Sequence, residues 1–204
     1  ATSSCRVATR WWWSTCVRGC GASFGTRDSF RSPRERDQPY RTFYREDPDA
    51  LGRLFVGPYL AFEPELSLIL EDQAGICGYA LGALDSRKFF ARYEQEWRPG
   101  LCARFPAPTG DPSQWTRVQQ VHHLYHHPDY FTPEPYERHP SHLHIDLLGR
   151  AQGRGYGRRM LEQVMGELRQ RGSLGAHLGV SVRNTLALGF YQRLGFQELI
   201  RVGS

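Results

Sequence analysis

The sequence predicts an α+β fold (α/β mixed) in which strands and helices are built around one sheet. Two patterns carry this prediction. Residues 66–84 show the alternation of a β-hairpin, and residues 141–202 alternate between strand and helix patterns, which implies crossover connections. With 204 residues, 40% of them hydrophobic, the chain is long and apolar enough to bury a sizeable core.

The first forty residues differ from the rest of the chain in charge. They hold seven arginines and three acidic residues, a net of +4 out of the +5 of the whole sequence. Their apolar residues follow neither a helix nor a strand period. We therefore expect a poorly ordered basic extension at 1–40 and one folded domain at 41–204. Because that domain is nearly neutral, the composition does not favour a nucleic-acid partner.

Cysteine and hydropathy patterns set further limits. The five cysteines are an odd number, which argues against a disulfide framework. Cys16 and Cys20 lack the second ligand pair of a zinc site. No apolar run approaches the roughly 18 residues of a membrane helix, and residues 1–40 lack the apolar core of a secretory signal. The expected location is cytoplasmic, with no membrane contact.

The domain opens with a predicted helix and then a hairpin. Asp47 and Pro48 are typical of an N-cap and a first helical turn, and apolar spacing continues to Phe55. The run 66–72 alternates as a strand, and after a short turn residues 76–84 form the returning strand.

An insertion follows at about 85–140. Aromatic residues at helical spacing predict a helix that buries one face: Phe89, Phe90, Tyr93 and Trp97. The prolines beyond them favour a loop. The His-His-x-x-His-His run at 122–127 places histidines four residues apart, which on a helix share a face that can hold a metal. The run lacks the glutamate of the HExxH pattern, so solvated or acceptor-lining histidines are the alternative, and no metal is predicted.

Residues 142–148 alternate between polar and apolar side chains and predict a strand with His142, His144 and Asp146 on one face. An amphipathic helix follows and ends near Gly172. The remaining predicted elements are a strand, a helix and a final strand at 178–182, 185–193 and 196–202.

A glycine-rich turn at 149–157 joins the predicted strand to its helix. Glycines that open directly into a helix leave backbone N–H groups at the helix N-terminus, where the dipole favours an anion. Arg154, Arg158 and Arg159 add positive charge there. The spacing fits neither the dinucleotide fingerprint nor the P-loop. The turn therefore binds another phosphate-bearing ligand or serves as a turn without a ligand.

Two motifs in this region resemble those of the GNAT acyltransferase superfamily. Gln152-x-x-Gly155-x-Gly157 is similar to its pyrophosphate loop, and the run from Asn184 through Tyr191 to Phe196 is similar to its C-terminal motif. The motifs occur in the expected order along the chain. The resemblance implies a GNAT fold: a twisted mixed central sheet flanked by helices, with the insertion before the cofactor-binding strand. It also implies acetyl-CoA as co-substrate.

Residues 71–85, 89–97 and 140–146 are similar to the acetyltransferase-like C-terminal domain of O-GlcNAcases, and more so to its stand-alone bacterial relatives. The long insertion is shared with this group. In the fused domain the cofactor loop is degraded, whereas here it is intact. The resemblance thus implies an acetyl-CoA-dependent N-acetyltransferase. The alternative is a catalytically silent pseudo-acetyltransferase that binds CoA or a protein.

The resemblance also implies roles for single residues. The strand end would polarise the thioester carbonyl, and the glycine loop and Asn184 would complete the cofactor site: Leu147, Leu148, Gly149, Gln152, Gly153, Arg154, Gly155, Tyr156, Gly157, Arg158 and Asn184. Tyr191 matches the general acid. Asp146 is the favoured general base, with His144 next and Glu71 of the hairpin a further possibility, although the His/Asp row has the alternative of orienting a neighbour or binding the acceptor.

The acceptor is expected to be an amine, either a small molecule or a peptide, and the protein a monomer or homodimer.

Overall fold

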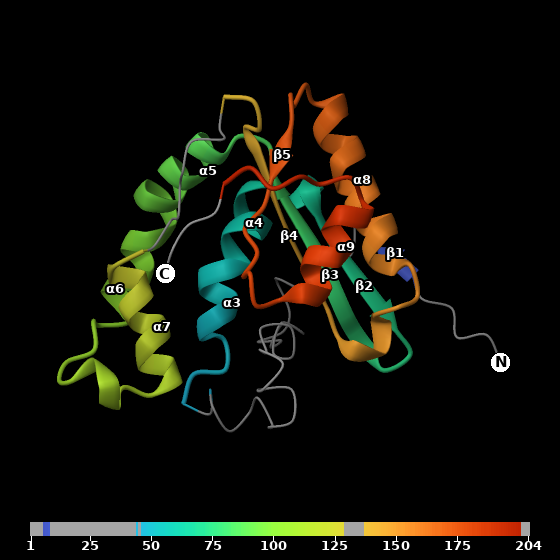
Figure 1. Ribbon diagram of the computed structural model, residues 1–204. Helices are drawn as coiled ribbons and strands as arrows, with labels where there is room; N and C mark the ends of the chain where they lie inside the picture. The colour runs from blue at the N-terminus through green and yellow to red at the C-terminus, as the bar shows by residue number, and fades with distance from the viewer. Residues whose placement is uncertain (1–5, 9–43, 45, 129–136, 201–204) are drawn as a thin grey trace.

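The computed structural model describes residues 6–8, 44, 46–128 and 137–200 (Figure 1). Five strands form one sheet in the order β1-β2-β3-β4-β5. Their bounds are Arg6–Ala8, Ser67–Asp72, Gly75–Ala83, Ser141–Leu147 and Ala176–His177. The first three pairings are antiparallel and the β4–β5 pairing is parallel. The predicted mixed sheet is confirmed.

The predicted hairpin is confirmed as β2 and β3. Its register pairs Ile69 with Tyr79, and a bulge between Leu70 and Glu71 shifts the last pairs. Across the next interface Tyr79 lies opposite Asp146 and Leu81 lies opposite His144. Since side chains alternate between the faces of a strand, Tyr79, His144 and Asp146 share one face of the sheet.

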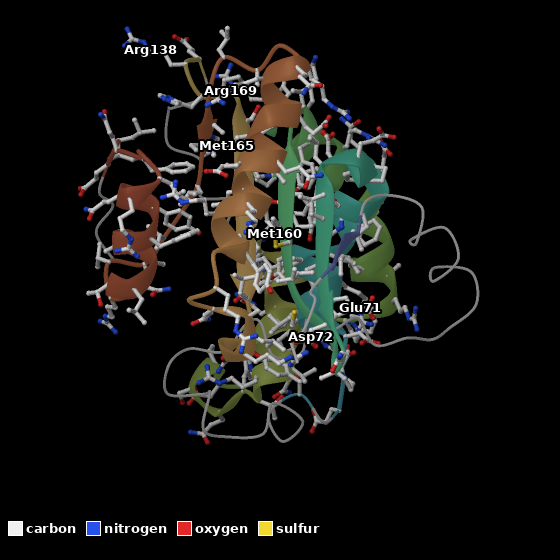
Figure 2. All side chains as sticks on the ribbon, turned by 90° about the vertical axis from the view of Figure 1, so that its right-hand side faces the viewer. Glu71, Asp72, Arg138, Met160, Met165 and Arg169 are labelled. Atoms are coloured by element: carbon white, nitrogen blue, oxygen red, sulfur yellow. The ribbon has the colours of Figure 1, made fainter. Side chains whose placement is uncertain are left out.

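The other face of the sheet packs against α8 (Tyr156–Gln170), as Figure 2 shows with Met160 lying over the strands. Apolar residues recur every three to four positions along α8 and all are buried: Met160, Leu161, Val164 and Leu168. They meet Leu66 just before β2, Leu68 and Leu70 of β2, and Leu143 of β4 in the main core. The helix predicted to end near Gly172 is thereby confirmed.

Helices of the N-terminal part and of the insertion cover the Tyr79 face (Figure 1). They are α3 (Ala50–Phe55), α4 (Gly57–Phe62), α5 (Ser86–Arg92), α6 (Arg98–Arg104) and α7 (Arg117–His126). A π-helical stretch, Tyr93–Trp97, joins α5 to α6. Val56 packs against Tyr79 and Leu81 of β3, and Leu51 joins α3 to Tyr125 of α7 in a second small core.

The predicted helix start at Asp47 is wrong by two residues. The N-cap of α3 is Asp49, and it makes no side-chain capping bond. Asp47 forms an ion pair with Arg53, and its Oδ2 accepts a hydrogen bond from His122 Nε2 at 3.0 Å. These partners come from α3 and α7, so the carboxylate ties two helices together instead of capping one.

Two predicted C-terminal strands are not found. The parallel strand β5 occupies Ala176–His177, and residues 178–184 have no strand structure. Residues 196–200 are likewise not a strand, and 201–204 lie outside the described residues. The predicted helix between them is confirmed as α9, Thr185–Arg193.

Most of the expected extension, 1–5 and 9–40, also lies outside the described residues; its Arg6–Ala8 segment pairs as β1 with β2. No helix in the described ranges is long and apolar enough to span a membrane.

Candidate active site

Strands β4 and β5 pair briefly and then part. Their two paired positions are Ser141 with Ala176 and His142 with His177. β4 continues to Leu147, whereas β5 ends at His177. Within the described part of the chain, no strand covers the remaining edge of β4. The sheet therefore offers a backbone edge from residue 143 to residue 147.

Two hydrogen bonds fix which β4 amides face that edge. Ser141 N–H donates to Gly175 O at 3.2 Å on the β5 side, and Leu148 N–H donates to Cys77 O at 2.9 Å on the β3 side. Because backbone groups alternate along a strand, the Leu147 amide faces the open edge. The Leu148 amide, which the sequence placed among the carbonyl-polarising groups, is used by β3. Leu147 and Gly149 are the candidates that remain.

The glycine loop ends at the N-terminus of α8. Gly153 and Gly155 have φ values of +70° and +79°, a left-handed conformation that glycine adopts without strain. Gly155 is the N-cap and supplies no side-chain cap, and the first helical bond runs from Arg159 N–H to Gly155 O at 3.2 Å. The amides of such a first turn have no partner within the helix and favour an anion.

Side chains brace the loop against the sheet. Gln152 Nε2 donates to Leu147 O at 2.7 Å, and the Gln152 amide donates to Gly149 O at 3.2 Å. Gln152 therefore shapes the loop, and the amides left for a phosphate begin at Gly153. Arg150 contacts the hairpin turn, with Nε 2.8 Å from Asp72 Oδ2 and Nη2 donating to Ile76 O at 2.9 Å. The sequence patterns did not single out Arg150.

Two arginines near the glycine loop, Arg158 and Arg154, differ in their contacts. Arg158 pairs with Glu162 at 3.4 Å and donates to Arg193 O at 3.3 Å, which joins α8 to the end of α9. Arg154 is exposed beside Gly153 and Gly155. Tyr156 and Gly157 form the first turn of α8, and Gly157 lies close to Leu147 and Phe190.

α9 carries the two C-terminal residues expected at the site. Asn184 caps the helix, with Oδ1 accepting from Ala187 N–H at 3.2 Å. Tyr191 lies in a half-buried aromatic cluster with Phe190 and Phe196. Burial raises the pKa of Tyr191 to about 12, and the charge of Asp146 adds to the shift. The Tyr191 phenol is therefore protonated near neutral pH. Asp146 is the charged group that acts on it.

Asp146 faces a second tyrosine across the sheet. Tyr79 lies directly opposite it on β3, and only 4% of Tyr79 is exposed. Burial raises the pKa of Tyr79 well above its usual value, and the Asp146 charge raises it further. The charge of Asp146 thus acts on a β3 phenol and on an α9 phenol, of which the sequence identified only Tyr191.

His144 and His142 are each bonded to a tyrosine. His144 Nε2 lies 3.1 Å from the Tyr79 hydroxyl, and His142 Nε2 lies 2.8 Å from the Tyr59 hydroxyl of α4. Burial lowers the pKa of His144 to about 4 and that of His142 to about 3. Both rings are therefore neutral near pH 7.

The protonation of His142 follows from its partners. The Ser86 hydroxyl donates its single proton to Pro140 O at 2.7 Å, so Ser86 Oγ accepts from His142 Nδ1–H at 2.8 Å. The Tyr59 hydroxyl then donates to Nε2. His142 is fully bonded, 7% exposed and stacked on Phe90, which makes it a structural residue at the point where β4 and β5 part.

Glu71, the other base considered, lies beyond the bulge near the end of β2, next to Asp72 at the hairpin end in Figure 2. β3 separates its strand from β4. Its position favours Asp146 and His144 over Glu71 as the group beside the open edge.

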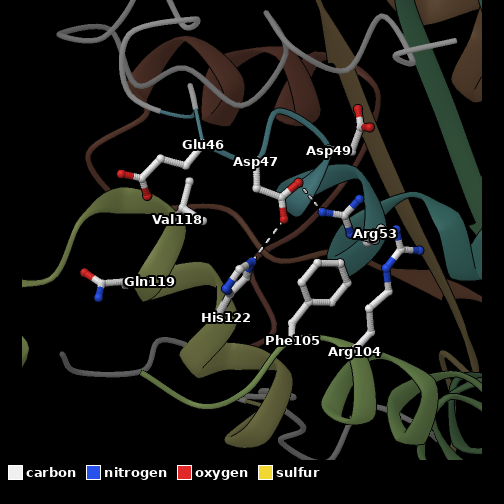
Figure 3. Close-up of a pocket in the computed structure, with 9 residues that line it drawn as sticks. All are labelled: Glu46, Asp47, Asp49, Arg53, Arg104, Phe105, Val118, Gln119 and His122. Carbon is white, nitrogen blue, oxygen red and sulfur yellow. Dashed lines mark hydrogen bonds and ion pairs between the residues drawn. The ribbon is translucent and has the colours of Figure 1, made fainter. Parts of the chain in front are cut away.

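A separate hollow of about 470 Å³ lies between α3, α6 and α7 (Figure 3). Asp47, Arg53 and His122 form its ion-paired wall, and Phe105 lies under the Arg53 guanidinium at 4.4 Å. None of the residues expected to bind the cofactor or to move protons lines it.

The histidine run lies on α7 and just after it, and its side chains have local partners. His122 pairs with Asp47, His126 Nε2 lies 2.8 Å from Phe105 O, and the rings of His123 and His127 are 4.4 Å apart. In the described ranges, no group of three or more histidine, cysteine or acidic side chains is placed to hold a metal.

Residues 33–196 match the model of the acetyltransferase (GNAT) family. The chain belongs to this family, and its mixed sheet with flanking helices is the corresponding fold. Protein O-GlcNAcase of Rattus norvegicus and that of Mus musculus are each 27% identical to it over 160 residues. The match covers 78% of this chain and 17% of the length of these relatives.

Solved structures agree. The crystal structure of SsHAT is 38% identical and has a TM-score of 0.69, covering 78% of this chain and 80% of that chain. PH1933 from Pyrococcus horikoshii OT3 is 14% identical with a TM-score of 0.55, covering 98% and 93%, and shows the fold alone.

Proposed function

We propose that this protein transfers an acetyl group from acetyl-CoA to an amine. The observation that carries the proposal is the open edge of β4, which runs from residue 143 to Leu147 and ends beside the uncapped N-terminus of α8. The backbone edge can pair with an amide-containing chain. The amides at the start of the helix can bind a phosphate group.

The residues that would hold acetyl-CoA fit its chemistry. Amides from Gly153 into the first turn of α8 would bind the pyrophosphate, with Arg154 adding charge. The Leu147 amide on the open edge would donate to the thioester carbonyl oxygen. When bound, acetyl-CoA supplies the activated acetyl group and the thiolate leaving group.

Asp146 and Tyr191 would handle the protons. Asp146 would accept a proton from the attacking amine, directly or through a water molecule. Tyr191 would donate its phenolic proton to the departing sulfur, and its raised pKa keeps it in the acid form at neutral pH. His144, neutral and bonded to Tyr79, is the second base candidate.

The acceptor would be a small amine or a peptide. The Tyr79 face of the sheet, toward which Asp146 points, is covered by helices of the insertion and the N-terminal part. Aromatic side chains of α4 and α5 gather there, including Phe62, Phe89 and Phe90. A neutral aromatic wall suits an amine better than a polyanion.

A thiol-release assay with acetyl-CoA and a panel of amines tests this proposal: spermidine, glucosamine, a lysine-containing peptide and a peptide with a free N-terminus. Wild-type protein is expected to release CoA with at least one of them. Tyr191→Phe and Asp146→Asn are each expected to lower kcat by about 10²- to 10³-fold, with acetyl-CoA affinity within about threefold.

Arg171→Met, an ion-pair residue at the far end of α8, serves as the control and should keep wild-type kcat. Acetyl-CoA binding without transfer to any amine would favour a silent binding module. Unchanged kcat in both site variants would contradict the proton roles.

A further inference from the structure

The face of β3 and β4 that carries Asp146 holds two tyrosine–histidine pairs of similar geometry. Tyr79 pairs with His144 at 3.1 Å, and Tyr59 pairs with His142 at 2.8 Å. The two histidines are two residues apart on β4, so the pairs lie on the same face at different distances from Asp146.

The two pairs differ in what lies next to them. In the Tyr59–His142 pair, the His142 ring is hydrogen-bonded to Ser86 and packed against Phe89 and Phe90, all of α5. The Tyr79–His144 pair adjoins Asp146, because Tyr79 is its direct cross-strand neighbour and His144 is its neighbour along the strand face.

The geometry of the Tyr79–His144 pair is restrained on several sides. The two rings stack at 5.6 Å with an angle of 20°, and the hydroxyl meets Nε2 at the ring edge. Val56 and Leu81 pack around the Tyr79 ring. Since both groups are neutral, a single proton bridges the hydroxyl and Nε2, and that bond fixes the orientation of the imidazole.

We propose that Tyr79 is a positioning residue of the active site, whose hydroxyl holds the His144 ring so that the Tyr79–His144 pair orients the Asp146 carboxylate toward the open edge of β4. This role rests on the proposed acetyl transfer. Tyr79 does not touch the reacting atoms; it acts through His144 and Asp146. The site then has a support on β3 as well as groups on β4 and α9.

Tyr79→Phe tests the role, and Tyr59→Phe is its matched control, because each removes one buried hydroxyl from one histidine on the same strand. With the fastest acceptor of the panel, Tyr79→Phe is expected to lower kcat about 3- to 10-fold, the size of one hydrogen bond, while KM for acetyl-CoA stays within about twofold. Tyr59→Phe is expected to keep kcat within about twofold.

A double variant separates positioning from packing. Adding Tyr79→Phe to His144→Gln is expected to cause no further fall in kcat, because the hydroxyl acts through the imidazole. In ¹⁵N spectra of the free protein, Tyr79→Phe is expected to shift the ring nitrogens of His144 and leave those of His142 unchanged.

Three results would overturn the role: a folded Tyr79→Phe variant with wild-type kcat, an equal fall in kcat for Tyr59→Phe, or unchanged His144 nitrogen shifts. A wild-type protein that binds no acetyl-CoA would instead overturn the proposed function itself. The spectra are recorded without substrate, so the two failures are distinguishable.

Discussion

The charge of Asp146 acts on residues that are distant from it in sequence. Tyr79 comes from β3, Tyr191 comes from α9, and the charge of Asp146 acts on both phenols. The spacing of residues 142–148 was enough to place His142, His144 and Asp146 on one face. The partners of these residues depend on strand register and helix docking, so Tyr59, Tyr79 and Ser86 could not be found from local patterns.

Gly78 shows how closely β3 and β4 pack behind the site. A Cβ atom at this position would lie 2.2 Å from Leu147 Cδ2, so Gly78→Ala is expected to destabilise the fold by about 1–3 kcal/mol. Urea unfolding measures this. Gly166 of α8 has open space around its Cα, and Gly166→Ala is expected to stabilise by about 0.5–1 kcal/mol through helix propensity. Equal effects of the two variants would contradict the close packing of Gly78 against Leu147.

At the scale of elements, the hairpin, α8 and α9 were predictable because their apolar periods are long and local. The strands expected at 178–182 and 196–202 were not found, since short apolar runs do not fix strand pairing by themselves. Asp47 was mistaken for a cap because its helix–helix partners, Arg53 and His122, are tertiary contacts.

The contacts between Arg150 and the hairpin turn, here called the clamp, join the glycine loop to the β2–β3 hairpin. Arg150 lies at the start of the glycine loop. Arg150→Met removes its hydrogen bonds to the Asp72 carboxylate and to the carbonyls of Gly75 and Ile76 at the hairpin turn. We expect acetyl-CoA to bind about 2- to 5-fold more weakly, with little change in stability because the pair is partly exposed. Calorimetry measures the affinity.

Arg171→Met is the matched control for Arg150→Met, since it removes surface ion pairs at the other end of α8. It should leave acetyl-CoA affinity at the wild-type value. A similar loss in both variants would show that the clamp has no specific effect on the loop.

At the scale of the whole molecule, buried neutral histidines make stability depend on pH. Above about pH 6.5, His142 and His144 are neutral in both the folded and the unfolded chain. Below that pH the unfolded chain takes up protons while the folded chain, with pKa values of about 3 and about 4, does not. The free energy of unfolding should therefore fall by up to about 1.4 kcal/mol per pH unit for each histidine.

Urea unfolding between about pH 7 and pH 5 measures how the free energy of unfolding changes with pH. This range lies above the pH at which most carboxylates titrate, so the histidines dominate the change. His144→Gln is expected to remove the contribution of one ring, while His142 and His177, whose pKa values burial also lowers, keep theirs. A stability that is constant over this range would mean that the two rings are not held neutral by the fold.

Acetyl-CoA is expected to bind along the open edge of β4, where that edge meets the start of α8. Isothermal titration of acetyl-CoA into the wild-type protein and into Gly155→Val tests it most directly, because valine does not tolerate the left-handed N-cap. We expect one site per chain with a Kd between about 1 μM and 1 mM, and binding at least tenfold weaker in the variant. No binding to the wild type at about 1 mM, or equal affinity in a folded variant, would contradict it.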